Sequence, residues 1–189
     1  MTKSVLLIVD MLSPYDFPGA DALAANGPSV VEKISRCREF AGRAEVPVVF
    51  ANDIDDQFSG SRAAIFDEAM RGEHPELVRP LKPGDGDCFL HKGQHSAFYG
   101  TPLAHLLHEW EVDELILTGQ VTEQCILYTA LDAHVRHYDI RIFTDCVLSI
   151  DSGLGDAALR MMEMNMGAKL ETSGDWLDRR TANRANPPG

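Results

Sequence analysis

Val5-Leu6-Leu7-Ile8-Val9-Asp10, near the start of the chain, consists of five consecutive apolar residues followed by a carboxylate. Because apolar and polar residues do not alternate in this run, it is typical of a strand buried on both faces, as in parallel sheets. A second run of the same kind follows at residues 47–51. Between the two, apolar residues recur at helical spacing over residues 28–44, after a stretch rich in proline and glycine. These segments predict a strand, a helix and a second strand.

The alternation continues along the chain. Further strands are expected at residues 87–91, 115–118, 140–143 and 168–170, and further helices at 63–70, from 102, at 125–136 and at 156–166. The stretch to residue 87 contains three prolines and is expected to be a loop. Alternating strands and helices imply parallel strands joined by right-handed crossovers. We therefore predict an α/β fold with helices on both faces of the sheet.

The chain length fits one compact domain. With 189 residues, 44% of them hydrophobic, the chain can bury a sizeable core. We expect a single domain over residues 1–178, followed by a polar tail over 179–189 that is mobile or contacts a neighbouring subunit.

The composition also limits the partners and the compartment. Acidic residues outnumber basic ones by 29 to 17, and the net charge of -12 repels phosphate backbones and anionic membranes. We therefore expect neither a nucleic-acid nor a membrane partner. The four cysteines are widely spaced and lack a C-x-x-C pair. Reduced thiols in a cytoplasmic protein are the simplest interpretation, since oxidised frameworks show tighter grouping.

Three chemically capable residues fall at the carboxyl ends of the predicted strands, where open parallel sheets bind their ligands. Asp10 ends the first strand, Lys92 follows the third, and Cys125 opens the helix after the fourth. Taken singly, each has an ordinary explanation: a turn residue, a solvated lysine and a small core cysteine. Together they suit acyl transfer. A helix N-terminus and an ammonium both favour a thiolate, and a carboxylate can take the thiol proton and return it to a leaving amine.

Two long segments resemble a known family. The segment Lys-Gly-Gln-His-Ser-Ala-Phe-Tyr-Gly-Thr-Pro-Leu at 92–103 resembles the K-x-x-x-S-A-F-x-G-T-x-L stretch of the isochorismatase-like cysteine hydrolases. The segment at 118–133, Thr-Gly-Gln-Val-Thr-Glu-Gln-Cys-Ile-Leu-Tyr-Thr-Ala-Leu-Asp-Ala, resembles their G-x-x-T-x-x-C-V-x-x-T-A-x-D-A stretch. Residues 7–12, followed by Asp16-Phe17, resemble their opening strand and D-F element, so the likeness spans about residues 4–170.

The resemblance implies a three-layer α/β/α sandwich, Rossmann-like, with a six-stranded parallel sheet. It implies a catalytic triad of Asp10, Lys92 and Cys125. It further implies a cis peptide between Gln120 and Val121, and an oxyanion hole formed by the backbone N–H groups of Val121 and Cys125. The expected activity is hydrolysis of a small carboxamide, or a related C–N bond, through an acyl-cysteine (thioester) intermediate.

The sequence departs from the family pattern at two points. Ile126 replaces the usual valine, which is a mild change. Nicotinamidases have D-x-H followed by a second histidine, which together hold a metal, whereas residues 52–61 here contain no histidine. We therefore predict no metal and no other cofactor, and do not expect nicotinamidase activity.

Two alternatives to amide hydrolysis stay open. Isochorismatases hydrolyse a vinyl ether with the aspartate and the lysine and need no thiol nucleophile, a route that Asp10 and Lys92 could serve. A catalytically silent member acting as a binding module or scaffold is the other alternative. The retention of all three triad residues favours acyl transfer over both.

The substrate and the assembly are less determined. Specificity is expected from residues 52–62 and 94–99. The candidate substrate-binding residues are Phe17, Gln94, His95, Phe98 and Tyr128. The aromatic residues among them suggest a small, partly apolar substrate. Methionines concentrated at 161–166 and the polar tail predict a homo-oligomer, a dimer or larger.

Overall fold

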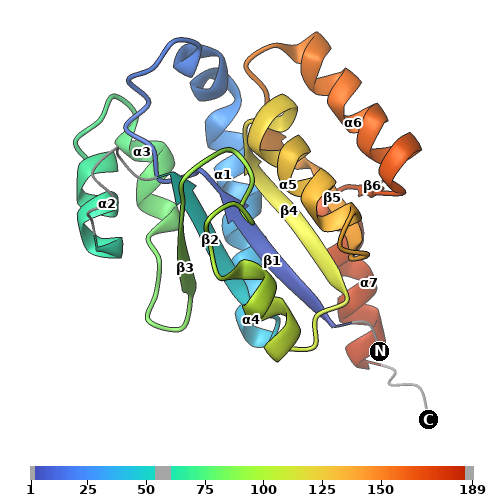
Figure 1. Ribbon diagram of the computed structural model, residues 1–189. Coiled ribbons are helices and arrows are strands. Elements are labelled where there is room, and N and C mark those ends of the chain that lie inside the picture. The colour runs from blue at the N-terminus through green and yellow to red at the C-terminus, as the bar shows by residue number, and fades with distance from the viewer. Residues whose placement is uncertain (1–2, 54–60, 186–189) are drawn as a thin grey trace.

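The computed structural model of the protein describes residues 3–53 and 61–185 (Figure 1). Its strands are β1 (Ser4–Val9), β2 (Val48–Asp53), β3 (Cys88–Lys92), β4 (Glu114–Gln120), β5 (Asp139–Leu148) and β6 (Lys169–Glu171). Its helices are α1 (Ala20–Arg43), α2 (Arg62–Ala69), α3 (Pro75–Val78), α4 (Leu103–Glu109), α5 (Leu127–His134), α6 (Ser152–Met166) and α7 (Ser173–Ala185). A 3₁₀ turn (Arg79–Leu81) follows α3, and a π-helical turn (Thr122–Ile126) precedes α5.

All six strands lie in one parallel sheet, as predicted. Their spatial order is β3-β2-β1-β4-β5-β6. The chain builds outward from β1 to β3, then crosses to the other side of β1 and continues with β4. This reversal leaves a crevice between the carboxyl ends of β1 and β4, the position at which doubly wound sheets bind ligands.

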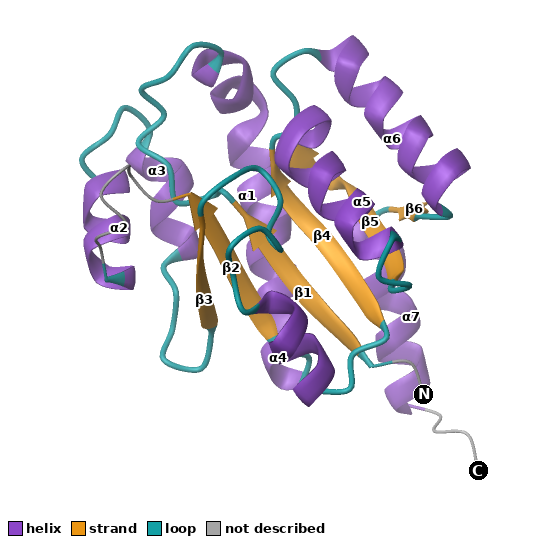
Figure 2. Cartoon of the chain, in the orientation of Figure 1, coloured by secondary structure: helices purple, strands orange, loops and turns teal. Residues whose placement is uncertain are grey.

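The uninterrupted apolar run of β1 is explained by two cores, one on each face of the sheet. Leu6 and Ile8 are fully buried in the core shared with α1, α3 and α7. Val5, Leu7 and Val9 are fully buried in the core shared with α4, α5 and α6. Figure 2 shows the two layers, with α4 and α5 in front of the sheet and α1 behind it. Alternate residues of one strand thus serve opposite layers.

Several predicted boundaries were wrong. Helix α1 begins at Ala20 instead of residue 28, and Pro28 lies inside it. Burial of Leu23 and of Gly27 against Leu77 explains the extra turns, because core packing outweighs the hydrogen bond that an internal proline removes. The region expected to be a loop before β3 contains α3 and the 3₁₀ turn, and Pro75 occupies the first turn of α3, where proline is tolerated.

The C-terminal segment also differs from the prediction. Helix α7 runs across the expected boundary at residue 178 and continues to Ala185, so the start of the predicted tail is helical. Trp176 anchors this helix by packing edge-to-face on Phe40, with ring centroids 5.1 Å apart. Arg179 forms an ion pair with Glu171 of β6, at 2.6 Å. The helix is therefore fastened to the sheet instead of extending from it; residues 186–189 lie outside the described residues.

The helices α5 and α6 carry apolar side chains into solvent. Within the described residues, the large hydrophobic side chains exposed in or beside these helices are Tyr128, Leu131, Val135, Leu154, Met161 and Met164. The predicted homo-oligomer stays a prediction. No helix in residues 3–53 and 61–185 combines the length and the apolar character that a membrane span requires.

Gly119 of β4 controls how closely β1 and β4 approach at the crevice. Its φ is +110°, and a Cβ placed there would lie 2.1 Å from the carbonyl oxygen of Val9. We expect Gly119→Ala to lower the free energy of unfolding by more than about 2 kcal/mol, because both the conformation and the close contact exclude a side chain. Urea denaturation followed by circular dichroism measures the change.

Gly42 provides the matched control. It lies in α1, where an added Cβ would meet nothing within 4 Å. Gly42→Ala is expected to raise the free energy of unfolding by roughly 0.5–1 kcal/mol, since alanine lowers the entropy cost of forming the helix. Equal effects of the two substitutions would contradict the role assigned to Gly119.

Candidate active site

The three residues singled out in the sequence meet at the crevice between β1 and β4. Asp10 follows β1 directly, Lys92 is the last residue of β3, and Cys125 lies in the π-helical turn after β4. The Lys92 Nζ lies 2.8 Å from the Asp10 Oδ2 and 3.6 Å from the Cys125 Sγ. The predicted convergence of the three side chains is therefore present, although they come from three different strand–helix units.

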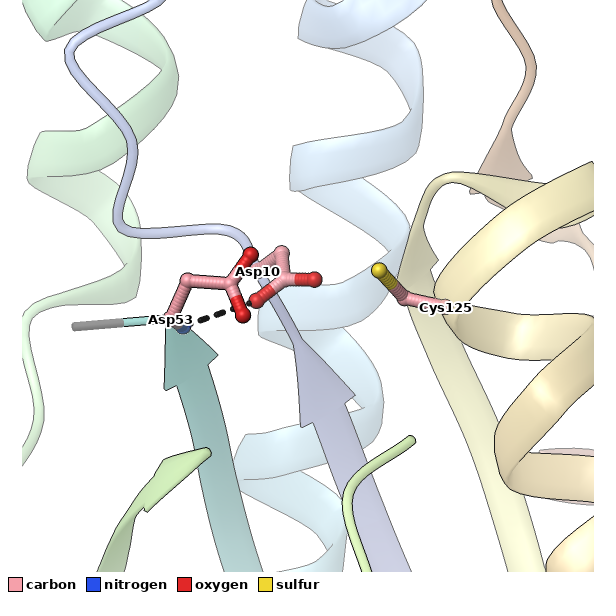
Figure 3. A group of neighbouring side chains, drawn as sticks. All are labelled: Asp10, Asp53 and Cys125. Atoms are coloured by element: carbon pink, nitrogen blue, oxygen red, sulfur yellow. Dashed lines mark hydrogen bonds between the residues drawn. The ribbon is translucent and has the colours of Figure 1, made fainter. Parts of the chain in front are cut away.

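Asp10 is held by hydrogen bonds from both neighbouring strands. Its backbone has a φ of +54°, in the left-handed region that few residues other than glycine adopt. Its N–H donates to the Ala51 carbonyl at 2.9 Å, and its own carbonyl accepts from the Gln120 Nε2 at 2.7 Å. The Gln120 Oε1 in turn accepts from the hydroxyl of Tyr15, which is fully buried. These bonds fix the backbone of Asp10. Figure 3 shows that its carboxylate faces Cys125 on one side and Asp53 on the other.

The sequence predicts that Cys125 opens an α-helix. Instead, Cys125 is the fourth residue of a π-helical turn, and α5 begins at Leu127. Turns of this kind recur at functional sites. The turn is fixed by Thr122, whose hydroxyl donates to the Leu148 carbonyl at 2.9 Å. Glu123 fixes it as well, because its carboxylate accepts from the backbone N–H groups that lead into α6. The peptide bond between Gln120 and Val121 is cis, as the family resemblance implied.

Asp53 is the site residue that sequence reasoning missed. Its Oδ1 lies 2.5 Å from the Lys92 Nζ, and its backbone N–H donates to the Asp10 Oδ1 at 3.1 Å. The parallel register pairs Asp53 of β2 with Lys92 of β3. The signal available in the sequence is its position just after a buried strand, within the segment 52–62 from which specificity is expected. Residues 54–60 of that loop lie outside the described residues.

The carboxylates of Asp10 and Asp53 and the thiol of Cys125 are close enough to consider a metal. Their ligand atoms lie within 4.8 Å of one another. However, the Lys92 ammonium contacts all three, at 2.5 to 3.6 Å, and its side chain is 0% exposed. This ammonium supplies the positive charge that a metal would otherwise supply. The donor set therefore does not fit a resident metal ion.

Burial and charge determine where the protons reside. Burial raises the pKa of Asp10 to about 6, because the attraction of Lys92 offsets only part of the lost hydration and Asp53 adds a second negative charge. Burial of Lys92 favours its neutral form, but Asp10, Cys125 and Asp53 outweigh this and raise its pKa. Burial and the neighbouring Asp10 raise the pKa of the Cys125 thiol, against the attraction of Lys92. Lys92 thus favours a thiolate, as expected from the sequence, but burial and Asp10 outweigh it and favour the protonated thiol.

The predicted substrate-binding residues separate into three groups. Phe17 and His95 line the pocket that contains Cys125, and the His95 Nδ1 lies 3.7 Å from the Cys125 Sγ. Gln94 and Tyr128 line a neighbouring surface groove, where the Tyr128 ring packs against His95 with centroids 5.3 Å apart. Phe98 lines neither of these, because its side chain is buried in the core that α4 and α5 share with the sheet.

The pocket itself is small. It encloses about 290 Å³, near the lower end of the volumes that bind small molecules. Its wall also includes residues that are not among the predicted substrate-binding candidates, from the segment after β1, the ends of β2 and β4 and the π-helical turn: Leu12, Ser13, Pro14, Asn52, Gln120 and Gln124. Val121 and Cys125, whose backbone N–H groups were expected to form an oxyanion hole, both line it.

Comparison with known proteins identifies relatives of the whole chain. The sequence model of the Isochorismatase domain matches residues 4–175. The isochorismatase family protein YaaI of Bacillus subtilis is 34% identical over 92% of this chain and 96% of its own length. The nicotinamidase of Escherichia coli is 35% identical over 93% of this chain and 98% of its own. The crystal structure of N-carbamoylsarcosine amidase from Thermoplasma acidophilum superposes with a TM-score of 0.70 at 27% identity, covering 91% of this chain and 97% of that one.

The raised pKa of Cys125 leads to an unusual expectation for Asp10. Asp10→Asn removes a negative charge next to the sulfur, so the thiol pKa should fall and alkylation by iodoacetamide at neutral pH should become faster. Each unit of decrease multiplies the thiolate fraction about tenfold. Lys92→Met removes the attracting charge and should slow the same reaction. Site-resolved mass spectrometry across pH measures both rates, with Cys88 of the same chain as the internal reference. Slower alkylation of Asp10→Asn would contradict the assigned electrostatics.

Proposed function

Because the chain belongs to the isochorismatase family, we propose that it is a cysteine hydrolase that cleaves a small carboxamide, or a related C–N bond, through an acyl-cysteine. The observation that carries the proposal is the convergence of the Lys92 ammonium on the Asp10 carboxylate and the Cys125 thiol, both of which line one small pocket. The names of the nicotinamidase and the carbamoylsarcosine amidase among its relatives support amide chemistry.

The first step forms the acyl-enzyme. Asp10 accepts the thiol proton as the Cys125 sulfur attacks the carbonyl carbon, so a free thiolate does not need to accumulate. Lys92 stabilises the negative charge as it moves from the carboxylate to the sulfur and the substrate. The oxyanion of the tetrahedral intermediate accepts hydrogen bonds from the backbone N–H groups of Val121 and Cys125. Collapse of the intermediate breaks the C–N bond, and protonated Asp10 gives its proton to the departing amine.

The second step restores the enzyme. Water enters the position left by the amine, Asp10 takes one of its protons, and the resulting hydroxide attacks the thioester carbonyl. The C–S bond breaks, the carboxylic acid product leaves, and the proton on Asp10 returns to the sulfur. The raised pKa of Asp10, about 6, suits this alternation, since the carboxyl group can both accept and release a proton near neutral pH.

The raised pKa of Asp10 also suits a competing reaction. A carboxyl group with a pKa of about 6 can donate a proton to a vinyl ether, which Asp10 and Lys92 would hydrolyse without the thiol. The two routes therefore differ in whether Cys125 is required.

Removal of the thiol distinguishes the routes. Cys125→Ala is expected to lower kcat/KM for carboxamides by at least about 10³, as removal of a covalent nucleophile does in other hydrolases. Cys88→Ala, which removes a half-buried thiol outside the pocket, should leave it unchanged. Ammonia release from a panel of carboxamides, ureas and carbamates provides the assay, and mass spectrometry of quenched reactions should show an adduct on Cys125. Full activity of Cys125→Ala on these substrates would exclude the acyl-cysteine, whereas vinyl-ether hydrolysis that Cys125→Ala retains, without ammonia release by the wild type, would favour the ether route.

The pH dependence follows from the role of Asp10. Only the ionised carboxylate accepts the thiol proton, so kcat/KM should be fully present above the Asp10 pKa and should fall as the pH decreases through about 6. Asp10→Glu, which keeps a titrating group, should retain an acid limb, whereas any residual activity of Asp10→Asn should lack it. Initial rates between pH 4.5 and 9, at substrate concentrations well below KM, give the profile. An acid limb that persists unchanged in Asp10→Asn would exclude Asp10 as its source.

A further inference from the structure

The pocket that contains Cys125 has an unbalanced charge. Two carboxylates, Asp10 and Asp53, lie beside the thiol, and one ammonium, Lys92, bridges them, which leaves one net negative charge on this cluster. The Lys92 side chain is 0% exposed, while the Asp53 side chain is 61% exposed. An incoming molecule therefore encounters the carboxylate of Asp53, and the positive charge lies behind it.

No lysine or arginine lines this pocket among the residues that the structure describes. Carboxylates in binding sites are held most strongly by arginine or lysine, through charge-assisted hydrogen bonds. A substrate that carries its own carboxylate would lose hydration here without gaining a cationic partner. The chain as a whole, at -12, adds to the repulsion at long range.

The rest of the pocket wall suits a ligand that carries hydrogen-bond donors and apolar groups. Asn52 is buried at the edge of the pocket, and its Nδ2 donates to the Leu12 carbonyl at 2.9 Å. This bond identifies the other amide atom as the oxygen, which has no hydrogen-bond donor among the described residues. Leu12, Pro14 and Phe17 give the same side of the pocket an apolar surface. The wall therefore adds a free acceptor and apolar contact to the site, and none of its described residues is a lysine or arginine that would pair with an anion.

We propose that the pocket accepts carboxamides whose remaining part is neutral or positively charged and excludes those that carry a carboxylate, and that Asp53 is the residue responsible for this specificity. The proposal rests on the proposed amide hydrolysis for its biological meaning. The charge preference of the pocket can nevertheless be measured without turnover, because Cys125 reports on any reagent that enters.

The first experiment uses methanethiosulfonates that carry the sulfonatoethyl, hydroxyethyl or aminoethyl group, which are anionic, neutral and cationic. Each rate of Cys125 modification is divided by the rate of the same reagent with 2-mercaptoethanol. The corrected rates should rank cationic, neutral, anionic, with at least about tenfold between the extremes at low salt and less at high salt. An anionic reagent that reacts as fast as the neutral one would overturn the proposal.

Asp53→Asn assigns the preference to one residue. This substitution should raise the corrected rate of the anionic reagent relative to the neutral one by several-fold, since it removes the exposed charge. Any change in the thiol pKa affects the three reagents equally and cancels in the ratio. Asp85→Asn is the matched control, because Asp85 is an exposed carboxylate paired with Arg62 away from the pocket. An unchanged ratio in Asp53→Asn would reject the role of Asp53.

The second experiment tests three amides that share a four-carbon backbone: 4-aminobutanamide, butanamide and succinamate, which are cationic, neutral and anionic. Ammonia release should be at least about tenfold slower for succinamate than for the other two. Preferred hydrolysis of succinamate would overturn the specificity while supporting amide hydrolysis. Charge-selective modification of Cys125 without hydrolysis of any amide would support the charge preference of the pocket and reject the proposed amide hydrolysis.

Discussion

The buried ammonium of Lys92 is the interaction on which the rest of the site depends. An ammonium removed from water is costly unless it is paired and hydrogen-bonded, so the two carboxylates around it are a condition for its burial. They are supplied by the ends of two neighbouring strands, at 2.8 and 2.5 Å. The parallel register aligns these strand ends, and the close approach at Gly119 brings the cysteine-bearing turn beside them. The strand ends and the cysteine-bearing turn are thus arranged around the buried positive charge of Lys92.

The same cluster determines the form in which the nucleophile rests. Many reactive cysteines are stored as thiolates beside a cation, whereas here two carboxylates also lie within 4.8 Å of the buried thiol. Burial and the neighbouring Asp10 raise the pKa of this thiol, so the cluster favours the protonated sulfur. In the proposed mechanism, activation consists of a proton transfer from Cys125 to Asp10.

The sequence was sufficient for the fold and for the three central side chains, because both depend on local patterns. Buried strands show as unbroken apolar runs, and Asp10, Lys92 and Cys125 lie at or near the ends of such runs. Features that depend on tertiary contacts were not accessible. Asp53 is explained by strand register, the extra turns of α1 by burial of Leu23, and the core position of Phe98 by packing beneath α4 and α5. The raised pKa of Cys125 could not be predicted for the same reason, because its largest cause is burial, and the extent of burial depends on tertiary packing.

The origin of the site in separate strand–helix units has a consequence for how the chain folds. Residues 10, 53, 92 and 125 are each about 30 to 45 positions apart, so no local segment can form the cluster by itself. Contacts of such long sequence separation require closure of large loops before they become favourable. A chain that has emerged only as far as β3 holds the lysine and both carboxylates, but lacks the strand that lies on the other side of β1. The cluster therefore forms only when β4 joins the sheet, and a partly folded form without β4 does not hold the cysteine beside the lysine and the two carboxylates.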